Sequence, residues 1–92
     1  MAKIRARLII SGRVQGVYFR YSTQQEANRL GLTGWARNLR NGDVEAVFEG
    51  DESQVEEMIR WCHQGPAGAV VSQVKEERGP ATDEFTRFSI TY

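Results

Sequence analysis

The sequence predicts a single α+β domain over residues 1–92, in which two helices cover one face of a mostly antiparallel sheet. Three observations support this fold class. The 92 residues suffice for one hydrophobic core but not for two. Apolar residues alternate in several short segments, which is typical of strands with one buried face. Two segments with helical spacing or helix-start signals interrupt these strands.

The first strand is predicted over residues 4–11, because apolar side chains occupy every second position there. A glycine-containing loop follows, and then a helix is expected over residues 22–30. Both Ser22 and Thr23 have a Gln or Glu three positions later, so two capping boxes compete for the start of this helix and the boundary stays open. Gly31 is a natural helix stop.

The segment TGWARN, residues 33–38, predicts a second strand. Asn41 and Gly42 then form the dipeptide that tight hairpin turns prefer. A third strand is predicted over residues 44–49, where alternation returns, and Gly50 ends it. Residues 33–50 therefore predict a β-hairpin.

A second helix is predicted to begin at the capping box of Ser53 and Glu56 and to end before Gly65. Its apolar stripe at helical spacing consists of Val55, Met58, Ile59 and Cys62. Two further strands are expected within residues 69–78 and 85–92. This order of elements predicts a ferredoxin-like sandwich with an extra C-terminal strand.

Composition restricts the function classes. Twelve basic residues balance twelve acidic ones, and the aromatic motif of RNA-binding sheets is absent, so no nucleic-acid partner is expected. The chain has one cysteine, no secretory signal and no apolar run of transmembrane length. We therefore expect a cytoplasmic, monomeric protein without membrane contact. Cys62 is expected to be a buried thiol.

The stretch GRVQGVYFR, residues 12–20, connects the first strand to the first helix. Glycines allow the backbone to turn so that successive N–H groups point inward and form an anion-binding nest. The helix that follows adds its positive N-terminal end, and Arg20 offers a planar fork that matches phosphate. The spacing fits neither a Walker A loop nor the dinucleotide pattern, so a solvated arginine at a helix start remains an alternative.

The strand–helix–strand connection makes the first two strands parallel, so their C-terminal ends lie at the same edge of the sheet. The loop and Asn38 are therefore expected to face one pocket, although Asn38 could also simply end a strand. Three further arginines are expected to raise the potential there: Arg13, Arg37 and Arg40. Whether Tyr18 and Phe19 wall this pocket or pack beneath it stays open.

GRVQGVYFR followed by GWARNLRNGDVEAVFEG resembles the two signature stretches of the acylphosphatase family, in the correct order. The resemblance implies a ferredoxin-like enzyme that hydrolyses small acyl phosphates to a carboxylate and inorganic phosphate, without a metal or cofactor. It implies that Arg20 holds the phosphoryl group and that Asn38 positions the attacking water. The phosphate-binding loop that it implies consists of Gln15, Gly16, Val17, Tyr18, Phe19 and Arg20.

Such chemistry needs few groups. The leaving group is a carboxylate, whose pKa of about 4 means that it needs no protonation at neutral pH. Phosphoryl transfer through a loose transition state requires mainly positioning and charge stabilisation. The substrate's own phosphate oxygen is the hypothetical acceptor of the water proton. A non-catalytic phosphate-binding or sensing module of the same fold is the alternative function.

Overall fold

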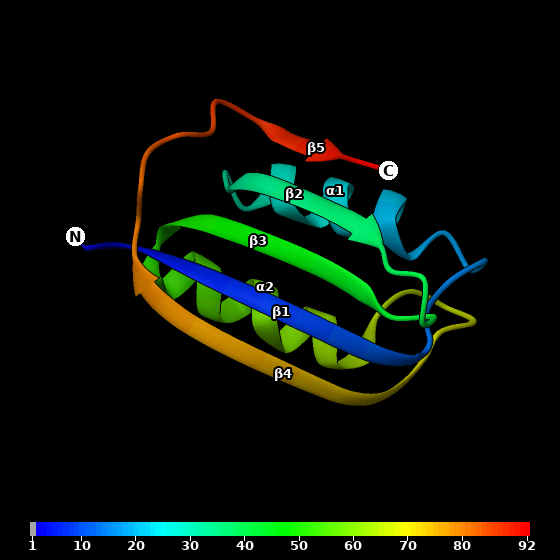
Figure 1. Ribbon diagram of the computed structural model, residues 1–92. Helices are drawn as coiled ribbons and strands as arrows, with labels where there is room; N and C mark the ends of the chain where they lie inside the picture. Colours follow the sequence, from blue (N-terminus) through cyan, green and yellow to red (C-terminus); the bar gives the residue numbers. More distant parts are fainter. Residues whose placement is uncertain (1) are drawn as a thin grey trace.

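The computed structural model describes residues 2–92, and its elements follow the predicted order. They are β1 (Lys3–Arg13), α1 (Phe19–Arg29), β2 (Thr33–Asn38), β3 (Val44–Asp51), α2 (Glu52–Gln64), β4 (Val70–Pro80) and β5 (Phe88–Ile90). The sheet order is β4-β1-β3-β2-β5, and every neighbouring pair is antiparallel except β2 and β5. Both helices lie on one face of this sheet (Figure 1), so the ferredoxin-like α+β prediction is confirmed.

The core fills the space between the sheet and the two helices. Alternate residues of β1 are fully buried, and all four residues of the predicted α2 stripe are buried as well. Phe48 of β3 stacks on Phe88 of β5 with ring centroids 5.4 Å apart, which joins the added strand to the core. Cys62 is buried as expected, and burial raises the pKa of its thiol.

The start of α1 differs from the prediction. The helix begins at Phe19, because Tyr18 adopts a left-handed conformation (φ 60°) that turns the chain into the helix. Both expected capping residues, Ser22 and Thr23, lie inside the helix. The Thr23 hydroxyl donates to the carbonyl of Phe19 at 2.7 Å, one turn back, instead of capping a free N–H group.

The start of α2 also differs. Asp51 is the residue before the helix, Glu52 is its first residue, and Ser53 lies within the first turn. No side chain of residues 2–92 caps this end. The Glu52 N–H group instead donates to the carbonyl of Ala2, the residue before β1, at 3.1 Å. A backbone carbonyl outside the helix thus accepts a hydrogen bond from one of the free N–H groups at the helix start.

Strand β1 is longer than predicted, because it continues through Gly12 to Arg13. Its pairing with β4 is irregular between Ser11 and Gly12, as in a β-bulge. Gly12 has a φ of 125°, and a Cβ atom there would lie 2.2 Å from the carbonyl oxygen of Val70. Glycine at this position therefore permits close approach to β4 and does not end the strand.

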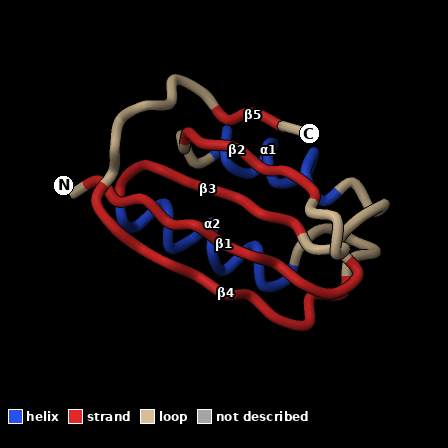
Figure 2. The backbone as a smooth tube through the Cα atoms, viewed as in Figure 1, coloured by secondary structure: helices blue, strands red, loops and turns tan. Residues whose placement is uncertain are grey.

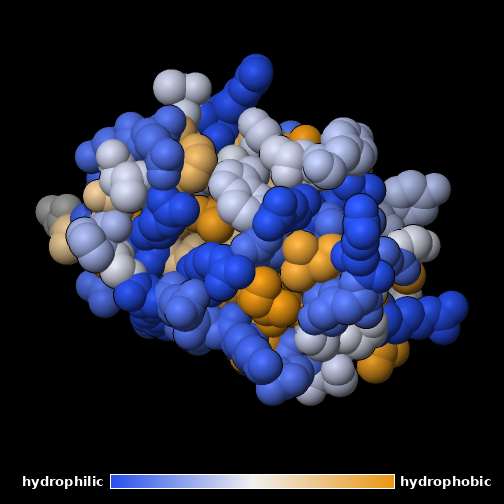
Figure 3. All heavy atoms as spheres, viewed as in Figure 1, coloured by the Kyte–Doolittle hydropathy of each residue, from blue (hydrophilic) through white to orange (hydrophobic). Residues whose placement is uncertain are grey.

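The face of the sheet opposite the helices is open and predominantly hydrophilic (Figure 3). On this face, Arg7 of β1 and Arg37 of β2 each donate from Nε to the buried Glu45 of β3, both at 2.7 Å. Burial opposes ionisation of Glu45, but the hydrogen bonds from Arg37 and Arg7 hold the pKa of its carboxyl below the ordinary value. Three neighbouring strands are thus linked through one carboxylate.

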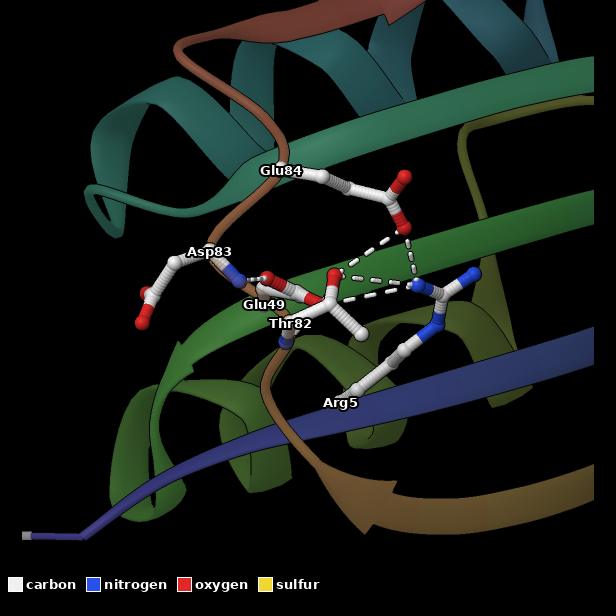
Figure 4. Close-up of polar contacts among 5 residues, drawn as sticks. All are labelled: Arg5, Glu49, Thr82, Asp83 and Glu84. Atoms are coloured by element: carbon white, nitrogen blue, oxygen red, sulfur yellow. Dashed lines mark hydrogen bonds and ion pairs between the residues drawn. The ribbon is translucent and has the colours of Figure 1, made fainter.

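The connection between β4 and β5, residues 81–87, carries the chain from one edge of the sheet to the other (Figure 1). Glu49 of β3 fixes this connection, as Figure 4 shows. Its carboxylate accepts hydrogen bonds from the N–H and hydroxyl groups of Thr82, both at 2.9 Å, and from the Asp83 N–H group at 3.0 Å. Arg5 donates to Glu84 at 2.6 Å. This anchoring leads β5 to its place beside β2.

Candidate active site

Three segments that are distant in sequence meet at one end of the sheet. Strands β1 and β2 run in the same direction because both are antiparallel to β3, and β5 is parallel to β2. The loops that follow β1 and β2 gather at this end, together with the C-terminus (Figure 2). They border a cavity of about 450 Å³ that is open to solvent and is lined by Val14, Gln15, Gly16, Tyr18, Phe19, Arg20, Tyr21, Asn38, Ile90 and Tyr92.

The loop between β1 and α1 is anchored at both of its ends. Val14 and Phe19 are buried in the core, and the Phe19 ring packs against Trp61 of α2 with centroids 5.7 Å apart. Between these anchors the backbone enters the left-handed region twice, at Gly16 (φ 75°) and Tyr18 (φ 60°). Phe19 therefore packs beneath the loop, whereas the Tyr18 side chain is exposed at the edge of the cavity.

The backbone N–H groups of residues 15–20 donate no hydrogen bond to any of residues 2–92. Those of residues 19 and 20 belong to the first turn of α1, where donors have no partner within the helix. A bent backbone with successive free donors, next to a helix N-terminus, is an arrangement that binds anions. Free amides therefore adjoin the cavity.

The side chain of Gln15 joins this loop to the β2–β3 turn. Its Nε2 atom donates to the carbonyl of Leu39 at 2.7 Å and to the carbonyl of Asp43 at 2.9 Å. Leu39 directly follows Asn38, so these two bonds fix the loop relative to Asn38. The family resemblance implied that Gln15 belongs to the phosphate-binding loop but did not imply this side-chain role, because no local pattern identifies carbonyl acceptors 24 and 28 positions away.

Arg20 is held by neutral groups. Its Nη1 atom donates to the Thr91 carbonyl at 3.3 Å, and its Cζ atom lies 5.1 Å from the centre of the Tyr92 ring. No acidic side chain within residues 2–92 forms an ion pair with it. Its positive charge is therefore not neutralised within the described chain. The contribution of Thr91 and Tyr92 was not predicted from the sequence.

Asn38, the last residue of β2, is half-buried and lines the cavity. Within the part of the chain that the structure describes, its side-chain amide forms no hydrogen bond, so both its donor and acceptor groups are available to a ligand. Asn41 has a different environment. It exchanges two hydrogen bonds with Asp43, at 3.1 and 3.0 Å, and shapes the turn as predicted.

Four residues that were predicted at or near the site do not line the cavity with their side chains. The Val17 side chain packs against the core and does not line the cavity, which leaves only its backbone for the cradle. The expectation that Arg37 raises the potential of the pocket is wrong, because its side chain lies on the open face and is paired with Glu45. Arg13 and Arg40 are exposed but do not line the cavity.

Neither of the helices in residues 2–92 is both long and apolar enough to cross a membrane. Over the same residues, His, Cys, Asp and Glu side chains form no group of three or more that could hold a metal ion. The donor groups of the cavity are backbone and side-chain amides, the hydroxyls of three tyrosines and one guanidinium, which together are suited to an anionic ligand.

Comparison with known proteins shows the family to which the chain belongs. The sequence model of the Acylphosphatase family matches residues 6–90. The chain is 51% identical to an acylphosphatase of Pelotomaculum thermopropionicum over all of both chains, and 53% identical to one of Marinobacter nauticus over 96% of each. The crystal structure of acylphosphatase from Bacillus subtilis superposes with a TM-score of 0.93 at 35% identity, covering 97% of this chain and 99% of that one. The chain therefore belongs to the acylphosphatase family of enzymes.

Proposed function

We propose that this enzyme hydrolyses small acyl phosphates in the cavity at the end of the sheet, with Arg20 and the loop amides binding the phosphoryl group and Asn38 positioning water. The observation that carries the proposal is the charge of Arg20, which has no acidic partner within residues 2–92 and faces a cavity next to free backbone N–H groups. A dianionic phosphoryl group complements this arrangement.

Arg20 and the loop amides stabilise charge on the phosphoryl oxygens. A planar guanidinium can donate two parallel hydrogen bonds to a phosphoryl group, and fixed backbone donors need no reorganisation as charge develops. The carbonyl of Thr91 and the ring of Tyr92 hold the guanidinium without neutralising it. Binding of the phosphoryl group therefore competes with no salt bridge that Arg20 forms to the described part of the chain.

Asn38 orients the nucleophile. Its amide oxygen accepts a hydrogen bond from a water molecule, which places that water in line with the bond to be broken. The water oxygen bonds to phosphorus while the bond between phosphorus and the acyl oxygen breaks. The electron pair leaves with the carboxylate, and one water proton moves to a phosphoryl oxygen, so the products are a carboxylate and dihydrogen phosphate.

A turnover assay with benzoyl phosphate tests this function, with inorganic phosphate as inhibitor. We expect hydrolysis and competitive inhibition, because the cradle recognises the phosphoryl group. Binding of phosphate without turnover would favour a non-catalytic phosphate-binding module. Purely non-competitive inhibition would contradict a shared phosphoryl site.

The variant Asn38→Ala tests the role of the water-positioning residue. Loss of one positioning or charge-stabilising group costs on the order of 10²–10³ in kcat, and phosphate inhibition should change far less. Asn41→Ala is the matched control, because Asn41 shapes the turn and does not line the cavity. Normal turnover by Asn38→Ala, or selective inactivation of a folded Asn41→Ala protein, would refute the assignment.

A further inference from the structure

All three tyrosines of the chain, Tyr18, Tyr21 and Tyr92, line the same cavity. They are 81, 56 and 99% exposed. The only other large hydrophobic side chain that is exposed within residues 2–92 is Val70, which lies outside the cavity. Exposed aromatic side chains are therefore concentrated at one place, and we call these three residues the tyrosine rim. Clustered exposed aromatic surface is typical of binding sites.

The tyrosine rim lines the same cavity as Arg20, the residue that is proposed to hold the phosphoryl group. Tyr21 follows Arg20 in α1, Tyr18 precedes the helix, and the Tyr92 ring lies 5.1 Å from the Arg20 guanidinium carbon. An acyl group is joined to the phosphoryl group through a single oxygen atom. The acyl group of any substrate must therefore lie close to the phosphoryl group that Arg20 binds, and the tyrosine rim lines the same cavity.

The cavity also exceeds the needs of the phosphoryl group. Its volume of about 450 Å³ lies within the range of pockets that accommodate organic ligands, about 300–1,000 Å³. A phosphoryl group with a two-carbon acyl group fills only part of it. The phenol rings present flat apolar faces, which stack on other planar aromatic groups more favourably than on a methyl group.

On these observations, and resting on the proposed function, we propose that the tyrosine rim is an acyl-binding subsite that favours acyl phosphates with a planar aromatic acyl group. The phosphoryl cradle supplies affinity that all acyl phosphates share. The rim supplies the part of the affinity that depends on the acyl group, through ring stacking and burial of apolar surface.

The test compares kcat/KM for benzoyl phosphate with kcat/KM for acetyl phosphate in wild-type protein, Tyr21→Leu and Tyr21→Phe. The ratio is compared between variants, because the two leaving groups differ in basicity. One lost aromatic contact should lower the benzoyl-to-acetyl ratio about two- to tenfold in Tyr21→Leu. Tyr21→Phe retains the ring and should retain the ratio. The double variant Tyr18→Leu, Tyr21→Leu should lower the ratio further.

Val70→Ala is the control for removal of exposed apolar surface away from the cavity, and it should leave the ratio as in the wild type. For Tyr21→Leu, the inhibition constant of inorganic phosphate should change less than KM for benzoyl phosphate, because phosphate carries no acyl group. An unchanged ratio in the double variant, with both substrates hydrolysed, would overturn the acyl subsite alone. Failure of the wild type to hydrolyse either substrate would overturn the proposed function and the subsite with it.

Discussion

The arginines of the open sheet face and the arginine of the cavity have opposite surroundings. Arg7 and Arg37 both donate to the buried carboxylate of Glu45, and Arg5 is paired with Glu49 and Glu84. Among the contacts within residues 2–92, Arg20 is held only by a backbone carbonyl and an aromatic ring. The formal net charge of the chain is zero, so this difference in pairing, and not an excess of basic residues, leaves positive charge at the cavity.

This contrast separates two uses of the same side chain. On the open face the guanidinium groups bridge strands and neutralise buried acids, so their loss should lower stability and leave chemistry intact. At the cavity the guanidinium has nothing to neutralise within residues 2–92, so its loss should lower activity and leave stability nearly intact. Four predictions test this separation.

The largest expected effect is that of Arg20→Lys on activity. Lysine keeps the charge but cannot donate two parallel hydrogen bonds to a phosphoryl group. We expect kcat/KM to fall on the order of 10²–10³, with weaker inhibition by inorganic phosphate and a thermal midpoint close to that of the wild type. Phosphate affinity near the wild-type value would show that the loop amides alone hold the group.

The reverse pattern is expected for Glu45→Gln. The substitution removes the buried acceptor that links Arg7 and Arg37, but these arginines are 45 and 47% exposed, so water partly replaces the lost bonds. The free energy of unfolding should fall by about 1–3 kcal/mol, and each kcal/mol lowers the melting temperature by roughly 4–8 °C. Denaturant unfolding measures this loss of stability, and kcat, which should stay close to the wild-type value, measures the effect on activity.

Glu77→Gln is the matched control for Glu45→Gln. Glu77 also pairs with Arg7, but it is exposed, so its loss should cost at most about 0.5 kcal/mol. If Glu45→Gln lowered kcat strongly in a folded protein, the open face and the cavity would not be separable in the way that their contacts indicate.

Gln15→Met tests whether the hydrogen bonds of the Gln15 side chain serve catalysis as well as stability. Methionine keeps the length of the side chain but cannot donate to the Leu39 and Asp43 carbonyls. We expect kcat to fall about tenfold, because a loosened loop misplaces Asn38 relative to the phosphoryl group, and we expect a smaller change in phosphate inhibition. A drop in thermal midpoint with unchanged kcat would mean that these bonds serve stability only.

The smallest effect concerns pH. The folded pKa of Glu45 lies below its ordinary value of 4.5, so its contribution to stability is complete above that value and is lost as the pH falls through the folded pKa. The difference in unfolding free energy between wild-type protein and Glu45→Gln should therefore shrink in acid. Denaturant titrations at neutral pH and below pH 4.5 test this expectation. A difference that grows in acid would contradict it.

Local patterns predicted the parts of the fold that local physics determines. Alternation in residues 4–11 predicted the buried face of β1, and Asn41-Gly42 predicted the turn after β2. The helix starts were predicted wrongly at Ser22 or Thr23 and at Ser53. Distant contacts replaced the capping boxes, since the core anchors the start of α1 and the Ala2 carbonyl accepts from the start of α2.

The candidate site shows the same limit. The two motifs placed Arg20 and Asn38 at one cavity, because the direction of β1 and β2 follows from their connection. Nothing local indicated that β5 would pair with β2 and bring Thr91 and Tyr92 to Arg20. The wrong expectation for Arg37 is a different case. The alternation of side chains along β2 already indicates that Arg37 and Asn38 lie on opposite faces of the sheet.

The burial of Cys62 gives the protein a chemical reporter of its own unfolding. It is the only thiol in the chain, it is inaccessible to solvent, and burial disfavours the thiolate that reacts with labelling reagents. A thiol reagent can therefore modify the protein only when α2 separates from the sheet. Labelling rates would then measure how often the core opens. Saturating phosphate should slow labelling if phosphate binds only the folded form, in which α2 is packed on the sheet.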